Sequence, residues 1–309
     1  MRSLLLIKIS LLPIILLNSC NAIMAQEILA EAKFSIENVK YLEIEGGFCN
    51  IELYGYSGSS LKMDGTIKGS GDTDKYEIIY REENNRVKVW IERPSNIWRN
   101  IQGNLRFDVP EGAVVLADNS SGNINAENLN ANEIKLEASS GNVTAKEISG
   151  ELYLKCSAGN ITLSDQKGKT SARTSSGNLK IDKLDGDLSA HASSGNISIY
   201  DVYGNVSADC SSGNIKLRDL EGVLEVESSS GNIRGEDIKL TGGSRFKATS
   251  GNITIGLLNK DNDLSFDLDS GSGNLYAVGS TADDRLILKN GPITITGTTS
   301  SGNQRYTTD

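Results

Sequence analysis

The sequence predicts an all-β protein in which one chain winds into a single-stranded β-helix, or β-solenoid, with rungs of about 18 residues. The first observation is a Ser-Gly-Asn-type tripeptide with nine copies between residues 121 and 274, and the second is a spacing of 18 to 22 residues between successive copies there. A fixed period of about 20 residues indicates that each copy is one structural unit stacked on its neighbours. The glycines of the nine copies are Gly122, Gly141, Gly159, Gly177, Gly195, Gly213, Gly231, Gly251 and Gly273.

The third observation is the pattern within one repeat, such as residues 211–228. Ile215 and Leu217 alternate with charged residues, and a second alternating run follows at 224–228. This alternation is typical of a strand with one solvated face, twice per repeat, and no stretch has helical periodicity. Two strands and two tight corners make one rung, and we expect a right-handed coil. Stacking aligns one apolar column: Ile124, Val143, Ile161, Leu179, Ile197, Ile215, Ile233 and Ile253.

The two corners of a rung have characteristic residues. Glycine recurs at the second corner, where it supplies a positive φ at little cost. The asparagine of each tripeptide forms a column at the first corner. One hypothesis is a buried ladder that bonds neighbouring rungs, and the other is mere tolerance of a left-handed conformation. The second-corner glycines are Gly150, Gly168, Gly186, Gly204 and Gly222.

We divide the chain into residues 1–25, 26–115 and 116–309. Residues 26–115 read as irregular first rungs plus a projecting hairpin, formed by the runs 75–80 and 86–91, that caps the open end. At the other end, Gly291 reads as a degenerate tenth copy of the tripeptide. The polar segment 298–309 is expected to shield the unpaired strand edge of the last rung.

The four cysteines are not expected to form disulfides. Cys156 and Cys210 occupy the same repeat position three rungs apart, roughly 14 Å at about 4.8 Å per rung, whereas bridged Cα atoms lie roughly 4.4–6.8 Å apart. Equivalent sites carry small residues, so the position favours a small core side chain. Cys49 has no evident partner.

Residues 1–25 have the features of an export signal, because their apolar run is too short to span a bilayer. Two interpretations of its processing stay open. Cleavage after Ala25 would release the chain, and this interpretation is favoured. Alternatively, residues 17–20 are similar to a lipobox, which would lipidate Cys20 and provide the only link to a membrane. Both place the protein in the periplasm, at the outer membrane or on the cell surface.

The chain is acidic. Its net charge is −9, and it becomes −11 without Arg2 and Lys8, the two charged residues of 1–25. Such a surface repels phosphate backbones, so nucleic acid is not an expected partner.

A search for catalytic or metal-binding groups yields little. His191, the only histidine, aligns with outward residues, so it is interpreted as a solvated side chain and supports no triad or metal site. A corner column of aspartates could bind Ca²⁺ or hydrolyse glycosides, but turn aspartates that cap backbone amides are the favoured interpretation. No cofactor or catalytic residue is assigned. The column contains Asp165, Asp201, Asp219 and Asp237, interrupted by Lys183.

One segment departs from the repeat chemistry. Trp98 lies between Arg93 and Arg99 in the stretch that follows the predicted hairpin. Aromatic and arginine side chains on a loop are typical of binding patches, although Trp98 could equally pack over the end rung. We interpret this segment as the one cationic and aromatic spot on an acidic protein and as its candidate partner-binding site.

An acidic exported chain with a strand that ends in Val109-Pro110-Glu111-Gly112, followed by serial Ser-Gly-Asn-Ile rungs, resembles the bacterial "putative adhesin" family and the related head domain named for its Gly-Ile-Asn repeats. The resemblance covers nearly all of residues 38–300 and implies a β-helix without assigned catalytic residues. The predicted function is a non-enzymatic exported binding or adhesion module for an envelope protein or a glycan surface. The alternatives are an envelope or envelope-stress scaffold, lipidated at Cys20, and a carbohydrate-binding or carbohydrate-active protein.

Overall fold

The computed structural model describes residues 27–69, 76–93 and 101–308. The described chain is built from strands, with one short 3₁₀ turn, η2 (Asp261–Asp263). No helix within it is long and apolar enough to cross a membrane.

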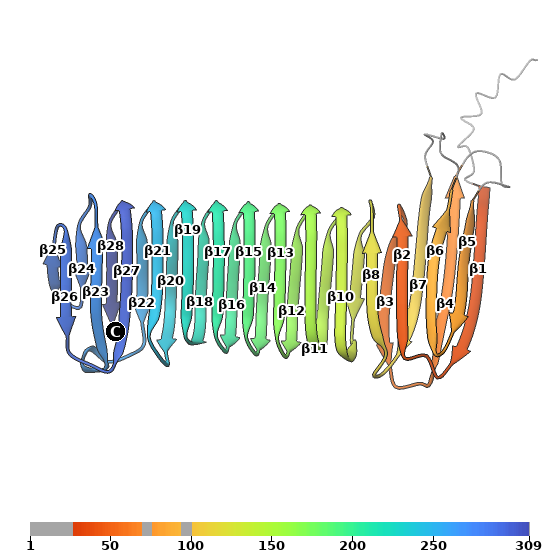
Figure 1. Cartoon of the computed structure of the whole chain (residues 1–309), viewed down its shortest axis with the longest axis horizontal. Helices are drawn as coiled ribbons and strands as arrows, with labels where there is room; N and C mark the ends of the chain where they lie inside the picture. Colours follow the sequence, from red (N-terminus) through yellow and green to blue (C-terminus); the bar gives the residue numbers. More distant parts are fainter. Residues whose placement is uncertain (1–26, 70–75, 94–100, 309) are drawn as a thin grey trace, which may run out of the picture.

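The strands fall into three groups along the chain (Figure 1). The N-terminal group is β1 (Glu27–Glu37), β2 (Tyr41–Gly47), β3 (Asn50–Tyr56), β4 (Ser60–Gly69), β5 (Glu77–Glu83), β6 (Arg86–Glu92) and β7 (Gln102–Pro110). The regular rungs are β8 (Val114–Asn119), β9 (Ile124–Glu127), β10 (Asn130–Ser140), β11 (Val143–Ala158), β12 (Ile161–Lys167), β13 (Thr170–Ser176), β14 (Leu179–Asp185), β15 (Leu188–Ser194), β16 (Ile197–Tyr203), β17 (Val206–Ser212), β18 (Ile215–Gly222), β19 (Leu224–Ser230), β20 (Ile233–Leu240), β21 (Ser244–Ser250) and β22 (Ile253–Leu257). The C-terminal group is β23 (Leu264–Ser270), β24 (Leu275–Ala277), β25 (Ser280–Ala282), β26 (Arg285–Lys289), β27 (Ile293–Ser301) and β28 (Gln304–Thr308).

The strands stack in two ladders that enclose the core, as predicted for a solenoid. We name the Ile ladder for the core isoleucine after each Ser-Gly-Asn corner, and the Ser ladder for the serines before it. The bent strand β11 belongs to both. The Ile ladder runs β1-β4-β7-β3-β9-β11-β12-β14-β16-β18-β20-β22-β28-β24-β25. The Ser ladder runs β5-β6-β2-β8-β10-β11-β13-β15-β17-β19-β21-β27-β23-β26.

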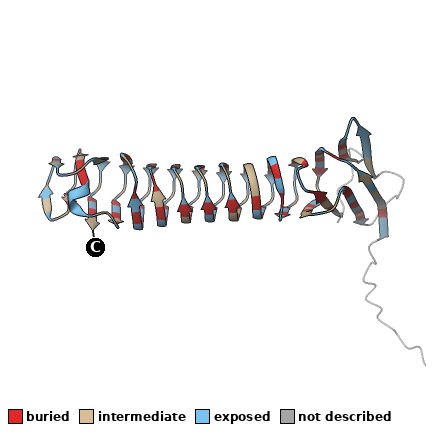
Figure 2. Cartoon of the chain, turned by 90° about the horizontal axis from the view of Figure 1, so that it is seen from below, coloured by how far each residue is buried: buried red, intermediate tan, exposed pale blue. Residues whose placement is uncertain are grey.

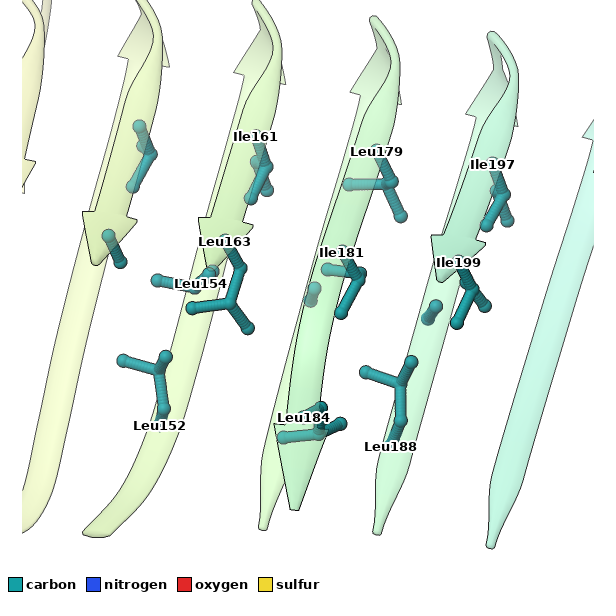
Figure 3. Packing of buried hydrophobic residues seen from close by; sticks show 14 of the residues in the cluster. Leu152, Leu154, Ile161, Leu163, Leu179, Ile181, Leu184, Leu188, Ile197 and Ile199 are labelled. Atoms are coloured by element: carbon teal, nitrogen blue, oxygen red, sulfur yellow. The ribbon is translucent and has the colours of Figure 1, made fainter. Parts of the chain in front are cut away.

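The regular rungs match the predicted stacking. Ile161 pairs with Leu179, Leu179 with Ile197, and Ile197 with Ile215, and the whole predicted column is at most 1 % exposed. Buried residues recur in the strands along the length of the coil (Figure 2). Figure 3 shows Ile161, Leu179 and Ile197 in a row across successive rungs. Each rung therefore buries its apolar face on its neighbours.

Close backbone contact explains the corner glycines. A Cβ on Gly177 would lie 2.0 Å from the carbonyl oxygen of Gly159, and one on Gly204 would lie 2.2 Å from that of Gly186. Positive φ values add to this requirement at both corners, for example 148° at Gly177 and 149° at Gly204. Other side chains are excluded there by the neighbouring rung as well as by the local conformation.

The asparagine ladder is confirmed, but its predicted burial is wrong. The backbone N–H of Asn214 donates to Oδ1 of Asn196 at 3.0 Å, and that of Asn232 donates to Oδ1 of Asn214 at 2.9 Å. The asparagines are exposed, because the side chain lies along the outside of the corner. The ladder therefore pairs corner amides that would otherwise bond water.

A left-handed backbone conformation explains the aspartate column. Asp165, Asp201, Asp219 and Asp237 have φ between 53° and 58°, and Lys183 has 57°. Within the described chain none of these aspartates accepts a hydrogen bond from a backbone amide, so the predicted capping role is wrong. Asn and Asp tolerate the left-handed conformation better than most residues, so the bend in the strand selects them.

The prediction for Gly291 is wrong, and so is that for residues 298–309. The true tenth copy is Ser301-Gly302-Asn303: the N–H of Asn303 donates to Oδ1 of Asn252 at 2.9 Å, and that of Asn274 donates to Oδ1 of Asn303 at 2.8 Å. Strands β27 and β28 therefore form a complete rung inserted between β21–β22 and β23–β24. Antiparallel β25 and β26 cover the C-terminal end instead.

At the N-terminal end, too, one rung is inserted between strands that are distant from it in the sequence. The rung β2–β3 lies between β6–β7 and β8–β9, although residues 57–113 separate β3 from β8 along the chain. The predicted hairpin of β5 and β6 is confirmed, whereas the outermost strand β1 was not predicted. The ring centres of Phe34 on β1 and Tyr80 on β5 lie 4.4 Å apart, so side chains of the two ladders meet across this end.

Candidate binding surface

Arg93 is the one residue of the predicted binding patch that the structure describes. Its guanidinium carbon lies 6.0 Å from the centre of the Phe48 ring, which meets Tyr76 edge to face with 6.1 Å between ring centres. Trp98 and Arg99 lie outside the described residues, as does Cys20. Arg93 is therefore placed over an aromatic cluster at the N-terminal end, and the grouping of all three residues stays a prediction.

Immediately before Arg93, strand β6 presents an aromatic side chain to the outside. Trp90 points away from the core because Val87 and Val89 on the same strand are fully buried. Ile79 pairs with Trp90 across the hairpin and shares its outward face. Tyr41, Val114 and Leu116 point outward on the neighbouring strands β2 and β8. We call these five side chains the head face; Tyr41 is 41 % exposed and the others are half-buried.

A network of ion pairs runs through the head face. Lys88 donates to Glu43 at 2.8 Å and also to Glu45, and Arg86 lies 3.6 Å from Glu43. The hydrogen bonds to Glu43 and Glu45 raise the pKa of the Lys88 ammonium. The Arg86 guanidinium also lies 4.9 Å from the centre of the Tyr41 ring. The face thus combines aromatic, aliphatic and arginine side chains, a composition enriched at protein interfaces.

The regular rungs differ at the equivalent positions. Outward residues on β13, β15 and β17 of the Ser ladder are small or polar: Ser171, Arg173, Ser189, His191, Ser207 and Asp209. Several large apolar side chains gather on the outside of the Ser ladder near its N-terminal end. Further along the described ladder, Tyr153 on β11 and Ile287 on β26 are single exposed ones. Sequence reasoning missed the head face, although the uninterrupted apolar run 113–117 was a signal that one strand has two apolar faces.

The interpretation of residues 93–99 as the one cationic and aromatic spot is wrong. Arginine lies over tyrosine elsewhere, at 4.2 Å for Arg106 and Tyr54, 4.4 Å for Arg305 and Tyr276, and 5.1 Å for Arg218 and Tyr200. These pairs form because outward residues of adjacent strands lie side by side, which a linear sequence does not display.

His191 and the aspartate column are the two features that the sequence raised as catalytic or metal-binding groups. His191 lies outward, with Nδ1 2.7 Å from Oδ1 of Asp209, and no serine hydroxyl within the described chain is hydrogen-bonded to it. In the same residues, no three His, Cys, Asp or Glu side chains are grouped so that they could hold a metal ion.

The three described cysteines are free and buried, which confirms the absence of a bridge between Cys156 and Cys210. The Cys156 thiol donates to the carbonyl oxygen of Gly141 at 3.0 Å, and the Cys210 thiol donates to that of Gly195 at 3.2 Å. Thr174 and Ser228 make the same bond from the same position. Alanine occupies the same position in other rungs, as at Ala138 and Ala192. The column therefore favours a small side chain, and those with a thiol or hydroxyl donate to a corner carbonyl.

Comparison with known proteins now assigns a family. The family model described as Toastrack DUF4097 matches residues 56–215 and 202–303, so the chain belongs to that family. Among solved structures, a putative cell adhesion protein from Clostridium sporogenes is 12 % identical, with 90 % of this chain and all of that chain covered and a TM-score of 0.20. Comparison with curated proteins finds no match.

Proposed function

We propose that this member of the Toastrack DUF4097 family is an exported, non-enzymatic binding module of the bacterial cell envelope. Its regular rungs serve as a rigid spacer, and its N-terminal end binds another envelope protein in the manner of an adhesin. The observation that carries the proposal is the head face, where Tyr41, Ile79, Trp90, Val114 and Leu116 replace the small and polar outward residues of the rungs.

Two physical arguments support a protein partner at this face. Aromatic side chains supply contact area at low entropic cost, and the salt-bridged Lys88, Glu43 and Glu45 provide polar contacts among them. The segment with Trp98 and Arg99 follows β6 directly in the sequence, so its predicted role joins this proposal. In the regular rungs, by contrast, the backbone N–H and C=O groups of the strands are already hydrogen-bonded to the neighbouring rungs, so they are not available to a partner.

Binding to isolated cell envelopes of the source bacterium tests the proposal. Residues 26–309 would be coupled to beads, and retention of wild type would be compared with Tyr41→Ala plus Trp90→Ala and with Trp98→Ala plus Arg99→Ala. Each pair should weaken retention about tenfold, since truncating an interface anchor costs at least about 1 kcal/mol. Tyr203→Ala, on a regular rung and 59 % exposed, is the matched control.

Thermal melting separates binding from folding in these variants. Surface substitutions usually shift stability by less than about 0.5 kcal/mol. Wild-type retention by a folded Tyr41→Ala plus Trp90→Ala variant would reject the head face. A Trp98→Ala plus Arg99→Ala variant that melts far below wild type would instead identify Trp98 as a capping residue.

Mass spectrometry of the mature N-terminus distinguishes free export from lipidation. Our proposal favours cleavage after Ala25, which would leave Gln26 as the first residue. A lipid-modified Cys20 would instead support the alternative of an envelope scaffold tethered to a membrane.

A further inference from the structure

The outer face of the N-terminal group carries a second feature, on the ladder opposite the head face. A hollow of about 440 Å³ lies on β1, β4 and β7 of the Ile ladder. Its volume falls within the range of about 300–1,000 Å³ usual for small-molecule sites. The charged residues of its lining are Lys33, Lys62, Asp64, Arg106 and Asp108.

Strand register brings these charges together. Lys33 pairs with Asp64, and Asp64 pairs with Arg106. In the adjacent row, Lys62 pairs with Asp108. Three cations and two carboxylates thus line one hollow, which leaves an excess of one positive charge on a protein whose net charge is −9.

Two of the cations already have carboxylate partners. Lys33 lies 3.1 Å from Asp64, and Arg106 lies 3.4 Å from Asp108. Lys62 forms no ion pair within the described chain, and its ammonium lies 5.2 Å from the centre of the Tyr56 ring. Because no carboxylate of the described chain is paired with this ammonium, its N–H groups can donate to an incoming anion.

The rest of the lining selects among anions. The carboxylates of Asp64 and Asp108 are able to accept hydrogen bonds from ligand hydroxyls, and they would repel a multiply charged phosphate. Phe34 and Met63 take part in the lining, but their side chains lie on the core side of the strands, since Met63 is 2 % exposed and the Phe34 ring meets that of Tyr80. The hollow therefore offers a cation and hydrogen-bond acceptors, and a sugar that carries one carboxylate and several hydroxyls meets both conditions.

We infer that this hollow binds an acidic sugar residue, such as the uronate unit of an anionic polysaccharide, with Lys62 as the main contact to its carboxylate. The site is separate from the head face, so the inference does not depend on a protein partner there.

Isothermal titration calorimetry on residues 26–309 tests the inference with a trimer of galacturonate as the probe. The acidic trimer should bind and a trimer of galactose should not, and added salt should weaken binding because the contact is electrostatic. Lys62→Gln should weaken binding about tenfold, as expected for loss of a hydrogen bond between charged groups. Lys62→Arg should restore part of it.

Lys180→Gln provides the matched control, because Lys180 is exposed on the same ladder and has no ion pair within the described chain. Equal weakening by Lys180→Gln would show nonspecific attraction and overturn the inference. Equal binding of both trimers, absence of binding, or full competition by acetate at the same carboxylate concentration would also overturn it. Unchanged melting of Lys62→Gln shows that the fold is intact.

Discussion

The regular rungs and the two ends of this molecule use the same kinds of strand, but different contacts decide the order of those strands. In the regular rungs, each residue pairs with the residue one repeat further on, as Ile197 does with Ile215. At the ends the partners are distant: Ile51 pairs with Ile124, and Ile253 pairs with Gln304. A repeat therefore specifies stacking between neighbours in the sequence, whereas an end must recognise a particular distant rung.

The two regions also differ in what fills the core. Small and branched aliphatic side chains repeat in the middle, whereas the inserted C-terminal rung buries Tyr306 between Phe246 and Phe266, with ring centres 6.0 and 5.7 Å away. Gln304 on the same strand is 1 % exposed and donates to the carbonyl of Asp269 at 2.8 Å. Shape and buried hydrogen bonds identify the correct neighbours where the repeat does not.

The largest expected effect tests the dry core of the regular rungs. Ile215→Asp places an unpaired charge in a column that is 1 % exposed, so we expect a loss of more than about 4 kcal/mol in the free energy of unfolding. Leu286→Asp, at 8 % exposure on the terminal strand β26, should lose less because water can reach the end. Chemical denaturation followed by circular dichroism measures both. Wild-type stability of Ile215→Asp would contradict the inward assignment.

An intermediate effect tests the corner glycines. Gly195→Ala would place a Cβ 1.9 Å from the carbonyl oxygen of Gly177, at a φ of 136°. Gly112 has a φ of 84° and nothing within 4 Å of an added Cβ, so Gly112→Ala isolates the conformational cost of about 1 kcal/mol. We expect Gly195→Ala to lose at least twice as much in thermal melting. Equal losses would mean that rung contact does not select these glycines.

The smallest effect near neutral pH concerns the buried thiols. Burial raises the pKa of Cys49 from its ordinary value of 9.0 to about 12, and it also raises the pKa of Cys156 and Cys210. The folded protein therefore retains these protons longer than the unfolded chain does. The contribution of these thiols to the free energy of unfolding is fully present below pH 9.0. It decreases as the pH rises toward 12, by up to about 1.4 kcal/mol per pH unit for each thiol.

Two measurements check this prediction. All three thiols should resist alkylation at pH 8 until the protein is denatured. Between pH 9 and 11, Cys49→Ala should lose less stability with rising pH than wild type does. Recovery of a disulfide-linked Cys156–Cys210 peptide under non-reducing conditions would contradict the rung register.

The candidate site was predicted only in part. Arg93, Trp98 and Arg99 were recognisable because they interrupt a repeat, and this drew attention to the N-terminal end. The head face was not recognisable, because Tyr41, Trp90 and Leu116 come from three strands whose adjacency depends on the inserted rung β2–β3. The hollow around Lys62 was hidden for the same reason, since β1, β4 and β7 are brought together by antiparallel pairing.

The sequence by itself determined the solenoid, the length of its rungs, the inward column from Ile124 to Ile253 and the unpaired state of Cys156 and Cys210. Each follows from local alternation and a fixed period, so nearest-neighbour stacking is enough to specify it. Only the tertiary structure decided that Ser301-Gly302-Asn303 belongs between two earlier rungs and that Gly291 does not belong to the corner column. A linear period cannot encode an insertion, because the inserted strand is selected by packing and hydrogen bonds among residues far apart in the chain.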